Sequence, residues 1–165
     1  MDDAKALPAF ISSKLNRPTV VENHILRSHL IAKLDHSLQR PLTMVSAPAG
    51  YGKTMLVSSW LETSTRPSAW VSLDKDDNDL RVFLSYLLTA IQSCHGTGFS
   101  DVGRQTLAMV NASTLASVST LVGSLISEID RVEQSFVLSL DDFHLIKDKS
   151  VLDFISKLLH YPPQS

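Results

Sequence analysis

The sequence has a single cysteine, Cys94, in 165 residues, so it can form neither an internal disulfide nor a cysteine-rich zinc site. Cys94 is expected to be a small buried hydrophobic residue. No apolar run approaches the ~20 residues that a membrane-spanning helix needs. The N-terminus, MDDAKALPAF, has acidic residues where a secretory signal would carry positive charge. These absences favour a cytoplasmic location without a membrane partner.

An excess of charge of one sign is also lacking, since 15 basic and 17 acidic residues give a net charge of −2. Without a basic stripe, this segment is not expected to read DNA itself. The sequence contains no internal repeat, no metal-ligand spacing among its histidines and no G-x-S-x-G nucleophile signature. The composition, 44% hydrophobic and 19% charged, permits a packed core.

The pattern of apolar residues and helix breakers divides the chain into a leader and one domain. Residues 1–20 read as an extended leader broken by Pro8 and Pro18, and residues 21–165 as a folded domain. Helical spacing predicts helices at 25–40, 53–61, 80–93, 115–132 and 151–160, and apolar runs predict buried strands at 42–46, 69–73 and 136–140. Residues 95–103 are expected to be loop. The alternation predicts an α/β fold with a parallel sheet, which binds ligands at the carboxyl ends of its strands.

The first motif at such an end is APAGYGKT, residues 47–54, which matches the P-loop pattern G-x-x-x-x-G-K-[ST] except at Ala47. Gly50 and Gly52 permit the backbone angles that turn successive amides toward a phosphate, and they leave no Cβ in the way. The following helix presents its N-terminus to the same anion. Because alanine tolerates only ordinary backbone angles, the turn must begin without a positive φ at Ala47.

This motif predicts that the chain binds a nucleoside triphosphate with Mg²⁺. Lys53 would supply a positive charge between the β- and γ-phosphates, in a catalytic role, and Thr54 would offer its hydroxyl to the metal. The residues expected to contact the nucleotide in this loop are Ala49, Gly50, Tyr51, Gly52, Lys53, Thr54 and Met55. The alternative, a chance G-x-G-K-T in a surface loop, is disfavoured by the preceding apolar run and the following helix.

The second motif is an acidic pair, Asp141 and Asp142, at the end of the apolar run 136–140. A strand that delivers carboxylates beside a P-loop suits a magnesium site, so Asp141 is predicted to hold the metal. The contact is expected to run through water, because Mg²⁺ keeps much of its hydration shell. Asp142 would orient or deprotonate the attacking water. The alternative is that both are solvated carboxylates that cap the next turn.

Other features have simpler interpretations. The acidic stretch 74–79 is not an EF-hand, because the sixth and twelfth loop positions are Asp79 and Ser85 instead of glycine and glutamate. It is expected to cap the helix that follows. Trp60 and Trp70 are expected in the core, and His144 is expected to pack or to point to solvent.

Taken together, the motifs resemble the N-terminal nucleotide-binding domain of MalT-like, LuxR-type transcriptional regulators, which are signal-transduction ATPases with numerous domains (STAND). The strings that carry the resemblance are Ser13-Lys14-Leu15 with Pro18, then ILR at 25–27, APAGYGKT, AWVSLD with Asp77-Asn78-Asp79, and LDDFHLI. The resemblance covers nearly the whole chain. It implies a P-loop NTPase-type three-layer sandwich with a parallel sheet, and Ala47 is usual in that family.

The resemblance also implies a function as a switch. An ADP-bound resting form exchanges to ATP, and the ATP form self-associates and binds DNA through a C-terminal domain that these 165 residues lack. Slow ATP hydrolysis resets the switch, so the chain would be at most a slow ATPase. The preference for ATP over GTP, and a position of Arg27 near the adenine, rest on the resemblance alone. It further implies that the domain is truncated before its sensor strand.

Two other functions stay open on the sequence. The chain could be a P-loop phosphotransferase that acts on a small molecule, although no Arg-rich lid segment is visible. It could also be a truncated interaction module that no longer binds nucleotide.

Overall fold

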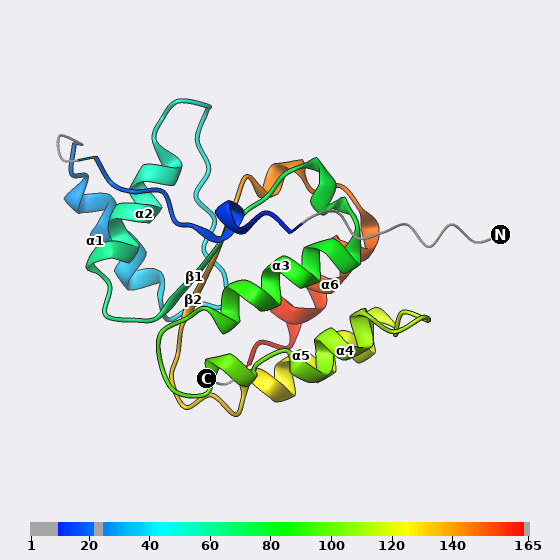
Figure 1. Cartoon of the computed structure of the whole chain (residues 1–165). Helices are drawn as coiled ribbons and strands as arrows, with labels where there is room; N and C mark the ends of the chain where they lie inside the picture. The colour runs from blue at the N-terminus through cyan, green and yellow to red at the C-terminus, as the bar shows by residue number, and fades with distance from the viewer. Residues whose placement is uncertain (1–9, 22–24, 164–165) are drawn as a thin grey trace.

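A computed structural model describes residues 10–21 and 25–163 of the chain (Figure 1). It is a mixed α/β structure with two parallel strands, β1 (Ser68–Ser72) and β2 (Val137–Asp141). Their register runs from Ser68 opposite Val137 to Ser72 opposite Asp141. The helices are α1 (Ser28–Ser37), α2 (Lys53–Thr63), α3 (Leu80–Gln92), α4 (Arg104–Val110), α5 (Val118–Ile129) and α6 (Lys149–His160).

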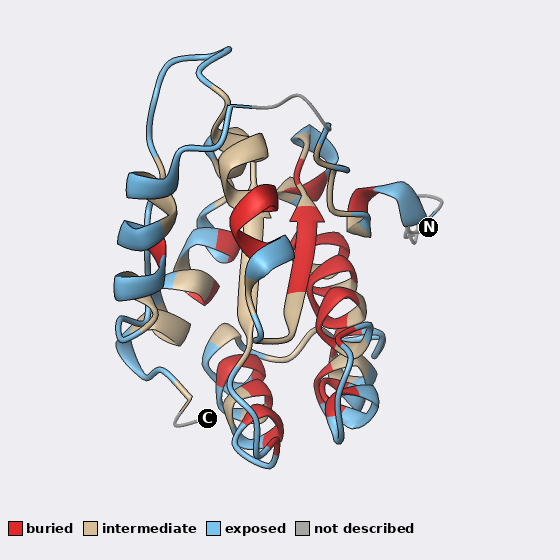
Figure 2. Ribbon diagram, turned by 90° about the vertical axis from the view of Figure 1, so that its left-hand side faces the viewer, coloured by how far each residue is buried: buried red, intermediate tan, exposed pale blue. Residues whose placement is uncertain are grey.

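The two strands lie between two groups of helices, α1 and α2 on one side and α3 to α6 on the other (Figure 1). Successive side chains of a strand point to opposite faces. Ala69 and Val71 accordingly belong to a large apolar cluster with α3, α5 and α6. Trp70 belongs to a smaller cluster with Leu34, Trp60 and Leu61 from the other side. The concentration of buried residues on β1 and on the helix faces toward it is visible in Figure 2.

Most of the predicted elements are confirmed, with shifts at their ends. The predicted strands 69–73 and 136–140 correspond to β1 and β2, although the residues of β2 are half-buried and not buried as predicted, and the predicted helices correspond to α1, α2, α3, α5 and α6. Trp60 and Trp70 are buried as expected, at 5% and 4% exposure. Cys94 is buried too, and burial raises the pKa of its thiol to about 11. Among the described residues, no helix is long and apolar enough to cross a membrane.

Helix α4 was missed by the sequence analysis because a distant residue stabilises it. The carboxylate of Glu128, on α5, accepts hydrogen bonds from the backbone amides of Gln105 and Thr106 and from the Thr106 hydroxyl, at 2.9, 3.2 and 2.6 Å. An acceptor at the first turn satisfies amides that a helix cannot pair internally. Glu128 lies 22 residues after Thr106 in the sequence, so no local capping signal announces this helix.

The prediction of a buried strand at residues 42–46 is wrong for this structure. The segment belongs to neither strand of the sheet, and Leu42 and Met44 are 53% and 78% exposed. Val45, by contrast, packs against the smaller apolar cluster. A strand requires hydrogen bonds from a neighbour, and neither β1 nor β2 pairs with this segment. The three-layer P-loop sandwich therefore stays a prediction.

The N-terminal elements also differ from expectation. Helix α1 begins at Ser28, and Ile25 and Leu26 precede it at 86% and 58% exposure. The described part of the leader is not extended throughout, because Ser12–Leu15 forms a turn of 3-10 helix. Pro8 lies outside the described residues.

The leader is fixed to the domain by a buried lysine. The Lys14 ammonium lies 2.7 and 2.6 Å from the two carboxylate oxygens of Asp77, 3.0 Å from Asp74, and 4.4 Å from the centre of the Tyr86 ring. Phe10 stacks on the same ring, with the centroids 4.7 Å apart. The acidic turn therefore has a second role beyond helix capping. Asp79 caps α3 as predicted, whereas Asp77 is fully buried and pairs with Lys14.

The charges of Lys14 and Asp74 shift each other's pKa. Burial alone would lower the pKa of Lys14, but hydrogen bonds and attraction from Asp77 and Asp74 outweigh it and raise that pKa above its ordinary value of 10.5. Burial likewise would raise the pKa of Asp74, but Lys14 and two backbone amides hold it below 3.8.

We predict that Lys14→Met destabilises the protein by about 3–5 kcal/mol, because it leaves the Asp77 carboxylate buried without its partner. Urea unfolding followed by circular dichroism measures this loss. In the double variant with Asp77→Asn, which keeps a hydrogen-bond acceptor for the Asp74 amide, much of the loss should be recovered. Additive losses in the two variants would contradict the pairing.

The ion pair between Lys14 and Asp74 predicts how the stability of the protein depends on pH. The contribution of Lys14, whose pKa is raised, is complete below pH 10.5 and is lost as the pH rises through that raised pKa. The contribution of Asp74, whose pKa is lowered, is present above pH 3.8 and is lost as the pH falls through that lowered pKa. The stability difference between the wild type and the double variant Lys14→Met/Asp77→Asn, which has no buried carboxylate left to titrate at this site, should thus be flat from about pH 5 to 9 and shrink beyond both limits. A difference that peaks inside this window would contradict the assignment.

Candidate functional site

The loop at residues 47–54 has the backbone conformation that its glycines predict. Gly50 and Gly52 have φ of 81° and 73°, in the left-handed region. Among the described residues, Asp142 is the only non-glycine with positive φ, so Ala47 has an ordinary backbone angle as expected. A Cβ at Gly50 would meet nothing within 4 Å, and one at Gly52 would lie 3.8 Å from Arg27. Before any ligand binds, the positive φ at Gly50 and Gly52, and not a lack of space for a Cβ, is what requires glycine at these two positions.

Helix α2 starts immediately after this turn and presents open amides to it. Gly52 is the N-cap, and no described side chain caps the helix there. The first backbone bond into the helix is from the Leu56 amide to the Gly52 carbonyl, at 2.9 Å. The earlier amides of the first turn, together with the positive end of the helix dipole, are therefore available to an anion.

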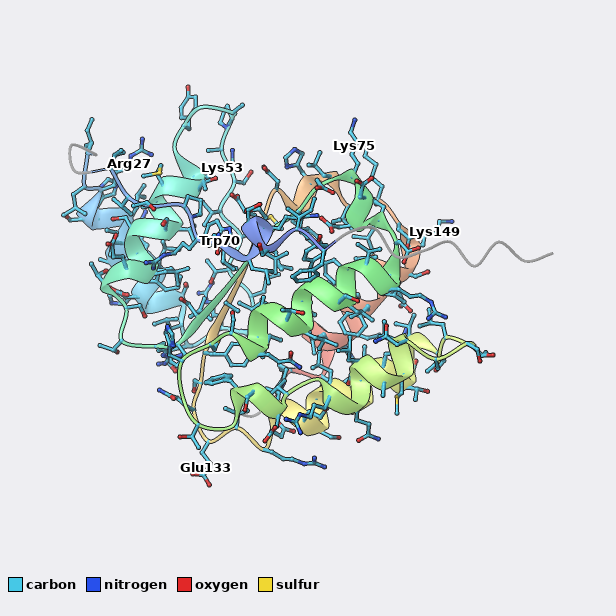
Figure 3. The ribbon with its side chains drawn as sticks, in the orientation of Figure 1. Arg27, Lys53, Trp70, Lys75, Glu133 and Lys149 are labelled. Carbon is cyan, nitrogen blue, oxygen red and sulfur yellow. The ribbon has the colours of Figure 1, made fainter. Side chains whose placement is uncertain are left out.

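The Lys53 side chain lies along the same loop (Figure 3). Its ammonium donates hydrogen bonds to the carbonyls of Ala47 and Pro48, at 2.9 and 3.2 Å. Because these acceptors are uncharged backbone oxygens, the positive charge is not neutralised by an acid of the described chain. A phosphate oxygen would offer Lys53 a stronger, charge-assisted bond.

Arg27 contacts the loop from a segment 24 residues upstream. Its guanidinium donates to the carbonyl of Tyr51 at 2.8 Å, beside Gly52. The residue is exposed and lies at the N-cap of α1. The contact with the adenine stays a prediction, but the side chain does lie against the loop. The sequence alone offered no signal for the hydrogen bond to Tyr51.

The two motifs recognised separately in the sequence meet in the structure. The Thr54 hydroxyl donates to the Asp141 carboxylate, at 2.9 and 3.2 Å from its two oxygens, across 87 residues of sequence. Asp141 is the last residue of β2, and Thr54 is in the first turn of α2. A half-buried hydroxyl beside a carboxylate is a set of hard oxygen ligands, which suits Mg²⁺. An ion there would draw its other oxygens from water and phosphate.

Asp142 has an unusual backbone conformation next to this pair. Its φ of 56° and ψ of 31° are left-handed, which costs most residues about 1–2 kcal/mol and is tolerated best by Gly, Asn and Asp. Its amide donates to the Asp141 carboxylate at 3.2 Å. The His144 ring lies 3.7 Å from the Asp142 carboxylate and forms an ion pair with it when protonated. A strained residue at such a position supports the hypothesis that the site is functional.

Asn78 joins the acidic turn to the loop that follows the aspartate pair, a role that its place in the string Asp77-Asn78-Asp79 did not indicate. Its side-chain oxygen accepts from the amides of Lys147 and Asp148, at 2.6 and 2.9 Å, and its nitrogen donates to the Leu145 carbonyl at 3.0 Å. The residue therefore supports the segment that carries Asp142 and His144. An asparagine among four aspartates was the available signal, since an amide can donate and accept at once.

Comparison with known proteins identifies relatives of this domain. No protein-family model matches the chain. Over 155 residues, 94% of the chain, it is 36% identical to the HTH-type transcriptional regulator MalT of Klebsiella pneumoniae subsp. pneumoniae. The identity and coverage are the same for MalT of Klebsiella pneumoniae (strain 342). The chain spans 17% of the length of each regulator, so the similarity supports a MalT-like relationship for this domain.

We predict that Gly52→Ala destabilises the protein by about 1–2 kcal/mol, because alanine must adopt the left-handed angle that Gly52 has. Urea unfolding measures the change. Gly123→Ala on α5 is the matched control, because its Cβ would meet nothing within 4 Å and its backbone is helical. That control should gain about 0.5–1 kcal/mol. Equal effects of the two substitutions would contradict the loop conformation.

Proposed function

We propose that this chain is the ATP-binding module of a MalT-like transcriptional regulator, with Mg²⁺ as its second ligand and at most slow hydrolysis of ATP. The observation that carries the proposal is the hydrogen bond between Thr54, in the P-loop motif, and Asp141, in the acidic pair. Neither motif alone requires a nucleotide. Their meeting at one end of β2 produces the donor set that a phosphate-bound magnesium ion needs.

The polyphosphate would lie in the turn from Ala49 to Met55. Main-chain amides of this turn and of the first turn of α2 would surround its oxygens, as in other anion-binding nests. Lys53 would exchange the carbonyls of Ala47 and Pro48 for phosphate oxygens. Arg27 would stabilise the conformation of the turn through its hydrogen bond to the Tyr51 carbonyl. We propose that the adenine lies beside Arg27.

Thr54 and Asp141 would hold the metal, which when bound would neutralise charge that develops on the phosphates. Asp142 is exposed and next to this pair, so its carboxylate would orient a water and accept its proton. The surrounding helices would complete the P-loop NTPase-type sandwich. The proposed preference for ATP over GTP is based on the relationship to MalT-like regulators and not on a contact within the chain.

As a switch, the module would distinguish ATP from ADP through the γ-phosphate and its metal. A ligand shifts an equilibrium between two states only by its preference for one of them. In the full-length protein, we propose that the ATP form self-associates and that DNA is bound by a separate C-terminal domain. The similarity to proteins named HTH-type transcriptional regulators supports this part. A cytoplasmic location follows from the same proposal.

Binding of a fluorescent ATP analogue with Mg²⁺ tests the cradle. Lys53→Ala should weaken binding about 10- to 100-fold, since a charge-assisted hydrogen bond contributes about 1.5–3 kcal/mol. Lys149→Ala is the control, because Lys149 is exposed at the start of α6. Asp141→Asn should weaken binding with Mg²⁺ present and leave it unchanged in EDTA. If Lys53→Ala binds ATP with the same affinity as the wild type, the proposal is contradicted.

A separate prediction concerns hydrolysis. Asp142→Asn keeps the left-handed backbone, because asparagine tolerates it nearly as well as aspartate. ATP binding should therefore persist, while single-turnover phosphate release should slow about 10²- to 10⁴-fold, as expected for loss of a general base. If phosphate release is as fast in this variant as in the wild type, the role of Asp142 is wrong.

A further inference from the structure

A cavity of about 460 Å³ lies at the end of the sheet opposite the candidate nucleotide site. Its lining includes Ser68, where β1 begins, whereas the candidate nucleotide site lies beside Asp141, opposite Ser72, where β1 ends. The two sites are therefore separated by the length of the strands. Nothing in the P-loop or the acidic pair contributes to this cavity.

The cavity has an apolar wall and a basic rim from separate parts of the chain. Leu15, Leu61 and Trp70 supply apolar surface. The indole nitrogen of Trp70 donates to the Ser72 hydroxyl at 2.9 Å, which fixes the ring. Arg17 comes from the leader just after its 3-10 turn, and Arg66 comes from the connection between α2 and β1. Four chain segments, at residues 15–17, 61–70, 93–95 and 134, thus converge on a volume within the range of small-molecule sites.

Both arginines of the rim are half-buried, and neither guanidinium has a hydrogen bond or an ion pair with any residue that the structure describes. Three other arginines, Arg27, Arg81 and Arg104, have partners within the protein. Arg81 donates to backbone carbonyls, and Arg104 pairs with Asp101 at 3.0 Å. Among the described residues, Glu62 is the one acid in the lining, and it is exposed. A guanidinium has five donors and is always charged, so two of them beside one cavity attract an anion.

We propose that this cavity binds a small organic anion, with a phosphate or carboxylate group held by Arg17 and Arg66. The planar forks of the guanidinium groups match either oxyanion with paired hydrogen bonds, which lysine cannot do. The carbon skeleton of the ligand would lie against Leu15, Leu61 and Trp70. Because one arginine belongs to the leader and the other to the domain, a bound anion would join the two at a further point, in addition to the Lys14 ion pair and the hydrogen bond from the Ser58 hydroxyl to the Pro18 carbonyl.

Calorimetric titration tests this site in a Lys53→Ala background, which weakens phosphate binding at the P-loop. The probes are glucose 6-phosphate, succinate and inorganic phosphate. Saturable binding of glucose 6-phosphate or succinate is expected, and Arg17→Gln and Arg66→Gln should each weaken it at least about tenfold. Arg104→Gln is the matched control and should change nothing, because Arg104 is exposed and lies outside the cavity.

The probes also separate the two sources of the anion. Binding of glucose 6-phosphate without succinate identifies a phosphate ligand, and the reverse identifies a carboxylate ligand. The double variant Arg17→Lys/Arg66→Lys retains both charges and loses the paired donors, so it should bind the anion more weakly than the wild type. It provides the test if a glutamine variant fails to fold. The proposal is overturned if no probe saturates, or if binding is equally strong in the lysine variant and in the wild type.

Discussion

The pairing of β1 with β2 is the constraint on which the rest of this structure depends. Because the two strands are parallel, the chain between them must cross from one end of the sheet to the other, and α3, α4 and α5 lie within that crossover. The same pairing separates the two apolar clusters, since alternate residues of β1 face opposite sides. It also sets the position of Asp141 opposite Ser72, at the end of the sheet where α2 begins with Lys53 and Thr54.

Charged residues connect distant segments in this fold as well as serving the candidate site. Lys14 and Asp77 join the leader to the acidic turn, and Glu128 supports the first turn of α4. In the described residues, no buried side-chain nitrogen or oxygen lacks a hydrogen-bond partner. A buried charge without a partner costs several kcal/mol, so these pairs make each segment's position depend on the other's. At the surface, the hydrogen bond from Arg27 to the Tyr51 carbonyl likewise connects two segments that are distant in the sequence.

The proposed functions assign the two ends of the sheet to different ligands. At the carboxyl end, the donors are backbone amides, one lysine and an oxygen pair suited to Mg²⁺. At the opposite end, the donors are two guanidinium groups beside an apolar wall. The chain spans 17% of the length of the MalT regulators to which it is similar, and the first assignment is proposed in that context. The second assignment rests on the cavity and its unpaired arginines alone.

Much of the candidate site was predictable because its chemistry is local. The string from Ala47 to Thr54 requires glycine where φ is positive, and the positions of Gly50 and Gly52 follow from that requirement. Strand β1 and helices α3 and α6 were predictable because apolar spacing reports burial directly, and β2 was predictable from its apolar run although its residues are only half-buried. The contact between Thr54 and Asp141 is not local, because the two residues are 87 positions apart, and of the two motifs only the acidic pair lies at the end of a strand in the structure.

The remaining features depend on partners that are distant in sequence. Residues 42–46 have the composition of a strand, yet a strand exists only where a neighbour supplies its hydrogen bonds, and here none does. Helix α4 depends on Glu128, and the leader depends on Asp77. Backbone angles and apolar spacing are thus properties of the sequence itself, whereas the pairing of strands and buried charges depends on which segments the folded chain brings into contact.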